Sequence, residues 1–394
     1  MKIPNGAKII ISRLSEHGYR GDIVGGCVRD FLLGKEPNDF DITTNALPDE
    51  MRTVFSDFRT VDTGIKHGTL TVLVDSVPYE VTTYRIDGEY TDNRHPDNVS
   101  FTDKLLDDLS RRDFTVNAMC YNDEDGLTDI FGGKEDLSLG IIRAVGDPVL
   151  RFSEDALRIL RALRFASTLD FTIEEETAKS IFKTAHLLAN VSRERIYVEW
   201  KKLIAGSGAS RILTEDRSVI QQIIPELSLT WQTLPAEFDA AEAEIRELYL
   251  FCTPCGDAPK KFASAMQSLR SDNKRKKFGL SVLENLDSSI QTEADIRVLL
   301  VKIGAEALCG VIKLRILLGT ATPSKLTLAQ QILSLSPCYR ISDMNINGND
   351  LFDIGFRGRE IGATLEKLLF MIAEGTVKNE KEELSAVAKG LFIS

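Results

Sequence analysis

The chain has 394 residues, of which 43% are hydrophobic and 27% charged, and its formal net charge is −11 at pH 7. This length predicts about two to four domains with real apolar cores. Apolar runs fall short of the roughly 20 residues that cross a bilayer, and the first one is too short for a signal peptide. We therefore expect a cytoplasmic protein without membrane contact. The acidic total also argues against a default nucleic-acid-binding protein, unless basic residues are locally concentrated.

The six cysteines are scattered along the chain, which suits a reducing compartment better than a disulfide framework. Only Cys252 and Cys255 form a close pair. A zinc site would need a second pair at matching spacing, which the sequence lacks. The role of this pair stays open.

The stretch "IVGGCVRDFLLG" predicts a strand, a glycine turn and a helix that starts near Val28. Gly25 and Gly26 would let backbone N–H groups approach a phosphate at the helix N-terminus. Arg29 would add a planar donor fork for phosphate oxygens. A plain tight turn is the alternative reading of the glycine pair.

The stretch "DFDIT" reads as a strand that carries Asp39 and Asp41 on one face. Two carboxylates this close repel, and a divalent cation, which carboxylate and phosphate oxygens hold, gives them a reason to coexist. We predict a Mg²⁺ site here, with both aspartates as ligands. Glu80 is the candidate third carboxylate, and Asp75 is the second choice because it sits beside a predicted turn. A solvated polar turn is the alternative.

Two further segments follow. Asp87–Phe101 is polar and contains proline, so it reads as a mobile loop, in which Arg94 is the candidate working residue. "RRDFTVNAM" is a basic pair, an acid and an amide, which we place near the start of a helix. Arg112 could meet a phosphate or sugar, and Asp113 and Asn117 could hydrogen-bond ribose hydroxyls. A capped helix with a solvated face is the alternative.

From about Leu150 onward most segments show helical periodicity, beginning with "SEDALRILRALRF". We expect one helix over 153–165 with Ser153 as its N-cap. An Asp–Arg pair made by Asp155 and Arg158 suits the base edges of cytosine and adenine, and guanine and uracil reverse that donor–acceptor pattern. These two residues could therefore select CTP and ATP without a template. A surface helix with ion pairs is the alternative.

GG-x-VRD together with DxD resembles the nucleotidyltransferase signature of the polymerase-beta-like superfamily. The later motifs resemble those of class II CCA-adding tRNA nucleotidyltransferases and bacterial poly(A) polymerases, strongly over the first 200 residues and weakly in the tail. The resemblance implies an α+β multi-domain protein, with a small α/β nucleotidyltransferase head followed by an all-helical neck, body and tail. The expected ranges are 1–145 for the head, 146–210 for the neck, 211–322 for the body and 323–394 for the tail.

The resemblance also implies roles for residues. Its second motif contacts the nucleotide's ribose, its EDxxR motif reads the base, and two later positions, Arg161 and Arg164, contribute to nucleotide or triphosphate binding. "DIFGGKEDL" is similar to the family's hinge between head and neck, and Arg94 lies in a loop that accompanies the switch from C to A addition. Arg193 and Arg195 match a motif that we expect to buttress the preceding helix.

The implied reaction is template-independent addition of C, C and A to the tRNA 3′ end, using CTP, ATP and Mg²⁺. The implied RNA contact is mostly with phosphates and shape, and candidate basic clusters are "KKL" and "RSDNKRKK", the latter equally readable as a solvated linker. No protein partner is implied. A bacterial poly(A) polymerase, an A-only adding relative, and a module that binds nucleotide or RNA without catalysis remain alternatives.

Overall fold

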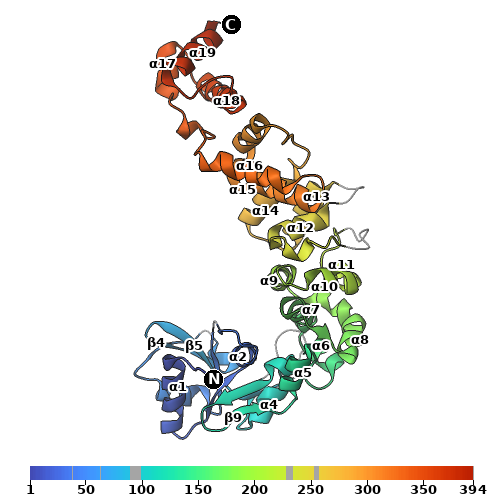
Figure 1. Cartoon of the computed structure of the whole chain (residues 1–394). Coiled ribbons are helices and arrows are strands. Elements are labelled where there is room, and N and C mark those ends of the chain that lie inside the picture. The colour runs from blue at the N-terminus through green and yellow to red at the C-terminus, as the bar shows by residue number, and fades with distance from the viewer. Residues whose placement is uncertain (38, 63, 89–98, 228–233, 253–256, 394) are drawn as a thin grey trace. The chain divides into compact units, whose positions relative to one another are not determined.

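The computed structural model describes residues 1–37, 39–62, 64–88, 99–227, 234–252 and 257–393 (Figure 1). The chain divides into two compact units, Met1–Pro225 and Glu226–Ser394. All but one of the residues predicted to act on the nucleotide lie in the described part of the first unit; the exception is Arg94, which lies outside the described residues. The four predicted domain ranges are finer than this division and stay predictions.

A seven-stranded mixed sheet forms the head, in the order β3-β4-β5-β2-β1-β8-β9. Alternating burial of side chains holds the strands in this sheet. In "TLTVLV" the residues Leu70, Val72 and Val74 are buried, and the residues between them are half-buried. The strands span Gly21–Val24 (β1), Asp41–Thr44 (β2), Arg59–Val61 (β3), Thr69–Val74 (β4), Val77–Thr83 (β5), Met119–Asn122 (β8) and Gly126–Asp129 (β9).

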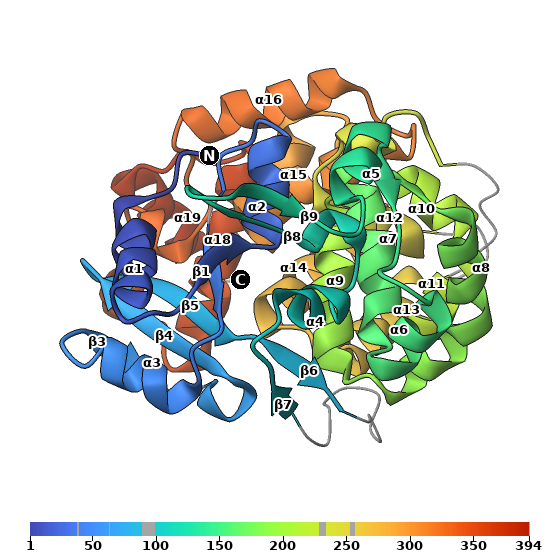
Figure 2. The ribbon, with the colours of Figure 1, turned by 90° about the horizontal axis from the view of Figure 1, so that it is seen from below.

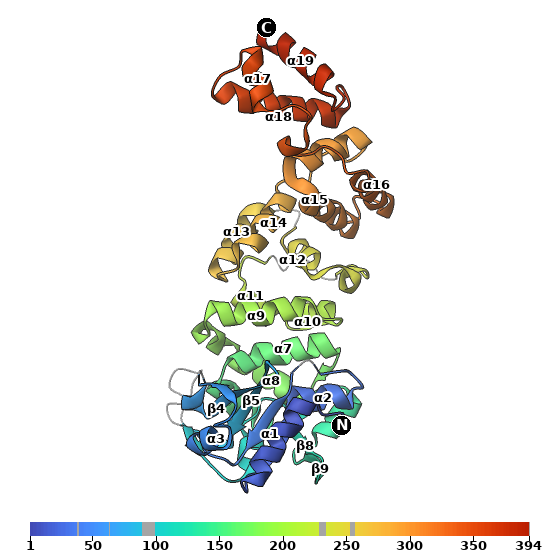
Figure 3. The ribbon, with the colours of Figure 1, turned by 90° about the vertical axis from the view of Figure 1, so that its left-hand side faces the viewer.

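The two faces of this sheet are differently covered. Helix α1 (Asn5–Glu16) packs on β1, β2 and β5, and touches α3 (Pro48–Val54) (Figure 3). The approach is so close that a Cβ at Gly6 would lie 2.6 Å from the Tyr79 ring. Ile42 and Val81, both fully buried, point to this side. Asp41 and Glu80, one position earlier on the same strands, therefore point to the opposite face.

The other elements of the head are short. Helix α2 spans Gly26–Leu32, α4 spans Leu105–Ser110, and α5 spans Gly133–Leu139. Strands β6 (Arg85–Asp87) and β7 (Val99–Phe101) pair with each other, and β6 packs beside α4 (Figure 2).

The rest of the first unit is helical, as predicted, apart from β11 (Thr172–Ile173), which pairs with β10 (Ile141–Ile142). Helices α7 and α9 lie side by side (Figure 3). The elements are α6 (Pro148–Glu154), α7 (Leu157–Leu169), α8 (Glu175–Thr184), the 3-10 helix η3 (Ala185–Asn190), α9 (Arg193–Ile204), α10 (Ala209–Glu215) and α11 (Arg217–Ile223).

In its described residues the second unit is helical throughout. Its elements are η4 (Phe238–Ala240), α12 (Ala243–Phe251), α13 (Ala258–Ser268), α14 (Asn273–Leu283), α15 (Glu293–Leu317), α16 (Pro323–Ser334), η5 (Ile341–Asp343), α17 (Gly348–Ile354), α18 (Arg359–Glu374) and α19 (Lys381–Ile393). The linker reading of "RSDNKRKK" is wrong, because most of it opens α14, with Asp272 as the N-cap. Arg275 in this segment is bound to the buried Glu247, so its charge is used inside the fold.

In the described part of the chain, no helix combines the length and the apolar character that crossing a bilayer requires. Of the close cysteine pair, Cys252 is half-buried at the end of α12, and Cys255 lies outside the described residues.

Candidate active site

The glycine turn stands next to the aspartate strand. Val24, the last residue of β1, pairs with Asp41, the first residue of β2. Gly25 follows with φ 84°, a left-handed conformation that favours glycine, and α2 begins at Gly26, slightly earlier than predicted. A Cβ at Gly25 would lie 3.2 Å from Nη1 of Arg112. The turn therefore brings backbone N–H groups, a helix N-terminus and a guanidinium to the level of Asp41.

Three carboxylates, those of Asp39, Asp41 and Glu80, lie close together beside this turn. Strands β2 and β5 run parallel with Ile42 opposite Val81, so Asp41 and Glu80 are neighbours one step earlier. The pKa of Asp41 is raised to about 6 by desolvation and by the like charges of Glu80 and Asp39, against the opposing charge of Arg112. Because the Asp41 side chain is exposed, repulsion by these like charges is a larger cause of the raised pKa than desolvation is. Asp75, the second choice for the third carboxylate, lies in the β4–β5 turn with φ 50°, beyond the Val74–Val77 pair, and it is Glu80 that stands beside Asp41.

Repulsion of Asp41 by Glu80 and Asp39 lowers folding stability, and a variant of Asp41 can reveal this effect. Because the folded-state pKa of Asp41 lies above its ordinary 3.8, ionised Asp41 lowers folding stability above about pH 6 and has no such effect below about pH 4. We expect Asp41→Asn, in metal-free buffer at neutral pH, to melt about 1–3 °C higher than the parent protein. The gain should disappear as the pH falls through this window. An equal gain at both ends of the pH range, measured by calorimetry, would exclude charge repulsion as its source.

The carboxylates fit a metal that substrate helps to hold. In the parts of the chain that the structure describes, no group of three or more His, Cys, Asp and Glu side chains is arranged to hold a metal ion alone. Mg²⁺ usually keeps several waters and is bound by one or two carboxylates plus substrate phosphates. Mutual repulsion of Asp41 with Asp39 and Glu80 is the condition that a bound cation relieves.

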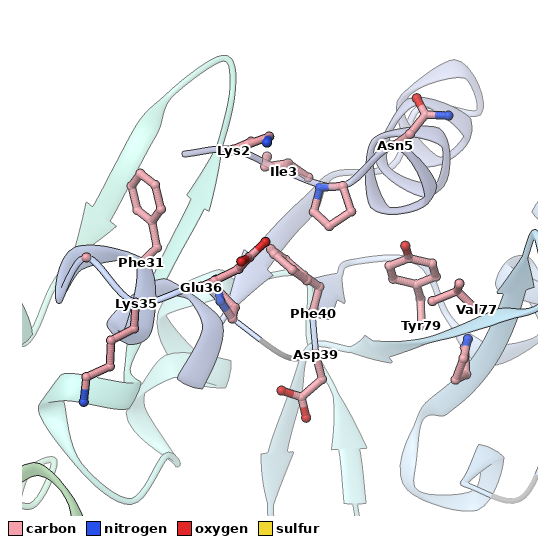
Figure 4. A pocket seen from close by; sticks show the side chains of 14 residues that line it. Lys2, Ile3, Asn5, Phe31, Lys35, Glu36, Asp39, Phe40, Val77 and Tyr79 are labelled. Atoms are coloured by element: carbon pink, nitrogen blue, oxygen red, sulfur yellow. The ribbon is translucent and has the colours of Figure 1, made fainter.

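A pocket of about 930 Å³ adjoins this site (Figure 4). Asp39 and Phe40 both line it, but their side chains point in opposite directions, the Asp39 carboxylate away from the ring (Figure 4). None of the other predicted site residues lines the pocket. Of the three carboxylates only Asp39 lines it, so this pocket is not the predicted nucleotide site.

The "RRDFTVNAM" segment does not start a helix as predicted. It follows the end of α4, passes through the 3-10 helix η2 (Thr115–Asn117) and enters β8. Asp113 accepts hydrogen bonds from Arg161 Nε at 2.8 Å and from Asn117 Nδ2 at 3.1 Å. Although desolvation opposes ionisation, Arg161 and Asn117 outweigh it and lower the pKa of Asp113 to about 2. Asn117 Oδ1 in turn accepts from Arg29 Nη1 at 2.7 Å. The head motifs thus form one network.

The predicted continuous helix over 153–165 is wrong. Helix α6 ends at Glu154, Asp155 adopts an extended conformation (φ −132°, ψ 101°), and α7 begins at Leu157. Oδ1 of Asp155 accepts from the backbone N–H of Leu157 at 3.1 Å, so Asp155 helps to start the second helix. Ser153 is consequently not an N-cap, and its hydroxyl donates to the carbonyl of Val149.

Asp155 and Arg158 are close in the chain but hold different partners. The Asp155 carboxylate pairs with Arg195 at 2.8 Å, which fits the expected buttressing by that residue. Arg158 donates to Glu154 Oε2 at 2.7 Å and to the Arg111 carbonyl at 2.8 Å. Asp155 keeps acceptor capacity beyond these bonds, since an ionised carboxylate has about four lone-pair sites. The other arginine of the motif, Arg193, donates to the carbonyl of Ile223.

Three arginines from two distant segments meet at one ring. The guanidinium carbons of Arg29, Arg161 and Arg164 lie 5.0, 5.4 and 3.7 Å from the centroid of Phe165. Cation–π attraction and nearby acids hold these like charges together, as Arg164 pairs with Glu199 at 2.8 Å. Burial lowers the pKa of Arg164 to about 10, so it stays charged at neutral pH. Such a cluster suits a polyanion.

The structure therefore assembles most of the predicted residues in the first unit. Sequence reasoning missed Phe165, which no motif distinguished from a core residue, and the buried carboxylates of Asp108 and Glu199. The only signal that Asp108 and Glu199 share is the burial of an acid, and burial is not visible in a sequence.

Comparisons with known proteins agree with this architecture. Residues 22–143 match the poly(A) polymerase head domain family. Residues 170–229 match the family described as "Probable RNA and SrmB- binding site of polymerase A", and residues 241–388 match tRNA nucleotidyltransferase domain 2. These matches confirm the predicted head and helical remainder.

Whole-length relatives are CCA-adding enzymes. That of Leuconostoc mesenteroides is 34% identical over 97% of this chain and 95% of its own length. That of Bacillus velezensis is 35% identical over 95% of both. Among solved structures, the Bacillus stearothermophilus CCA-adding enzyme in complex with CTP superposes with a TM-score of 0.80 at 31% identity, covering 100% of this chain and 98% of that one. The protein is therefore a member of the CCA-adding enzyme family, the tRNA nucleotidyltransferases.

Proposed function

We propose that this chain adds C, C and A in turn to the 3′ end of tRNA, using CTP and ATP. The observation that carries the proposal is full-length similarity to CCA-adding enzymes, joined to a site with paired carboxylates beside an arginine cluster. The RNA 3′-hydroxyl loses its proton to solvent as its oxygen forms a bond to the α-phosphorus of the nucleotide, and the bond from that phosphorus to the α–β bridging oxygen breaks. Pyrophosphate is the leaving group.

We assign the metal to Asp39 and Asp41, with Glu80 beside them. Enzymes of this family generally use a divalent cation, and Mg²⁺ is the ion that two carboxylates and a phosphate suit best. Such an ion would supply charge neutralisation at the phosphoryl oxygens and a more acidic attacking hydroxyl. The protein's own part is to hold the Asp41 carboxylate at the start of β2, with Asp39 two residues before it, next to the turn at Gly25.

We assign the nucleotide to the groups around them. Gly25 and Gly26 offer backbone donors, and Arg29, Arg161 and Arg164 offer three positive charges, to the triphosphate. We assign the ribose to Arg112, Asp113 and Asn117, and the base edge to Asp155 with Arg158. A tRNA substrate implies a cytoplasmic location, and neck, body and tail, divided as predicted above, would hold it.

Incubation with labelled CTP and ATP, Mg²⁺ and tRNA that lacks its 3′ end tests the proposal. We expect extension by C, C and A only, and no extension of tRNA that already ends in CCA. Long A tails would identify a poly(A) polymerase, and A added only to tRNA ending in CC would identify an A-only enzyme. No incorporation would leave a binding module.

A further inference from the structure

Helix α4 carries a carboxylate that no step above uses. Asp108 is 0% exposed, and it is held by three side chains. Its Oδ1 accepts from Arg111 Nη2 at 2.6 Å, and its Oδ2 accepts from Arg112 Nη2 at 3.2 Å and from Thr43 Oγ1 at 3.1 Å. Burial alone would raise the pKa of Asp108, but the two arginines outweigh it and hold the pKa below its usual range. The group is thus a fully paired, buried anion.

One of these bonds ties Asp108 to the metal strand. Thr43 lies two residues after Asp41 on β2, so both side chains point to the same face of the sheet. The hydroxyl oxygen of Thr43 also lies 3.3 Å from the carbonyl oxygen of Thr82, which is on β5 two residues after Glu80. Asp108 therefore contacts β2 two residues beyond Asp41, on the face that carries Asp41 and Glu80.

A second bond fixes Arg112, whose guanidinium reaches the glycine turn. Its Nη1 occupies the space that a side chain at Gly25 would need, and its charge opposes the raised pKa of Asp41. Among the described residues, Nε of Arg112 is buried without a hydrogen-bond partner. Arg112 is thus held at one nitrogen by Asp108, and it reaches toward the place where we put the nucleotide.

The third bond reaches the base-reading side. Asp108 holds the side chain of Arg111, and the carbonyl oxygen of Arg111 accepts from Arg158 Nη2 at 2.8 Å. One carboxylate therefore links β2, which carries Asp41, to the end of α4, which supports both Arg112 and Arg158.

We infer that Asp108 is a positioning residue for nucleotide binding: it fixes Arg112, and through Arg111 the support of Arg158, against the strand that carries Asp41. The inference rests on the proposed function. A long side chain that is ordered before the nucleotide arrives loses less entropy on binding. Asp108 touches no base edge in this scheme, so it acts on affinity for both nucleotides alike and not on the choice between them.

Asp108→Asn keeps the shape and removes the charge. We expect its KM to rise by about five- to tenfold for CTP and for ATP equally, with kcat changed by less than about threefold. In a protein that already carries Arg112→Ala, adding Asp108→Asn should raise KM by clearly less than it does in the parent, because only the route through Arg111 to Arg158 remains. Asp107→Asn, on the same helix turn with its carboxylate bound to Thr102, is the matched control and should keep the parent kinetics.

An unchanged KM in Asp108→Asn, or a full additional effect in the Arg112→Ala background, would overturn the inference. If Asp108→Asn does not fold, Thr43→Val carries the test by removing one bond to Asp108. A smaller rise in KM for both nucleotides is then expected, and an unchanged KM refutes the role. The parent protein is assayed in parallel: if it transfers no nucleotide at all, the proposed function fails, and otherwise only the role of Asp108 is judged.

Discussion

Asp39→Ala and Asp41→Ala are each expected to lower nucleotide transfer by at least about 1,000-fold while CTP binding largely survives. Transfer depends on a cation that these carboxylates would hold, because it would polarise the reacting phosphate and make the attacking hydroxyl more acidic, which the arginines alone do not do. Binding depends mainly on the arginines around Phe165 and on the glycine turn, which both variants leave in place. Single-turnover transfer and calorimetric titration with CTP measure the two effects separately.

The matched control is Asp75→Asn. Asp75 is an exposed aspartate of the same sheet, in the β4–β5 turn, where asparagine tolerates the left-handed backbone. It should transfer nucleotide like the parent. If either alanine variant kept its turnover, Asp39 and Asp41 would not be the metal ligands.

Asp155→Ala should lose the preference for CTP and ATP over UTP and GTP by about 10- to 100-fold, the value of one good base-edge pair. Its carboxylate would accept the exocyclic N–H of cytosine or adenine, and alanine offers no acceptor. The loss of folding stability should be smaller than the loss of nucleotide preference, since the variant loses only the pairing with Arg195 and one hydrogen bond from Leu157. Competition assays with all four nucleotides and a melting curve measure both consequences.

Asp170→Asn is the control for this variant. Asp170 lies at the other end of α7 with φ 57°, where asparagine is also tolerated, and it pairs with Arg211. Its nucleotide preference should equal that of the parent. An Asp155→Ala protein with parental preference would refute base reading by this residue.

Sequence alone anticipated those parts of the site that are local. The two glycines and Arg29 lie within five residues, and Asp39 and Asp41 are separated by one, so each set is close along the chain. The predicted strand includes both aspartates, but β2 begins at Asp41, so strand geometry places Asp41 and not Asp39. Glu80 could be chosen because it lies in a strand, and the parallel pairing of Ile42 with Val81 places it beside Asp41.

The break at Asp155 could not be predicted, because "SEDALRILRALRF" has helical periodicity throughout. Its cause lies elsewhere in the chain: Arg195, 40 residues later, holds the carboxylate that also caps Leu157. The partners of Arg161 and Arg29 were equally hidden, because Asp113 and Asn117 reach them only after the head sheet and α7 have packed. Periodicity predicts elements, and long-range pairing decides where they stop.

In the proposed mechanism, one nucleotide touches both the carboxylates of the head and the Asp155–Arg158 edge. A crystal structure of the full chain with CTP and Mn²⁺ in place of Mg²⁺ tests this directly. We expect an anomalous peak at the carboxylates of Asp39 and Asp41, the α-phosphate beside it, and the cytosine edge within hydrogen-bond distance of Asp155 and Arg158. A nucleotide whose phosphates reach the metal while its base contacts neither residue would contradict it.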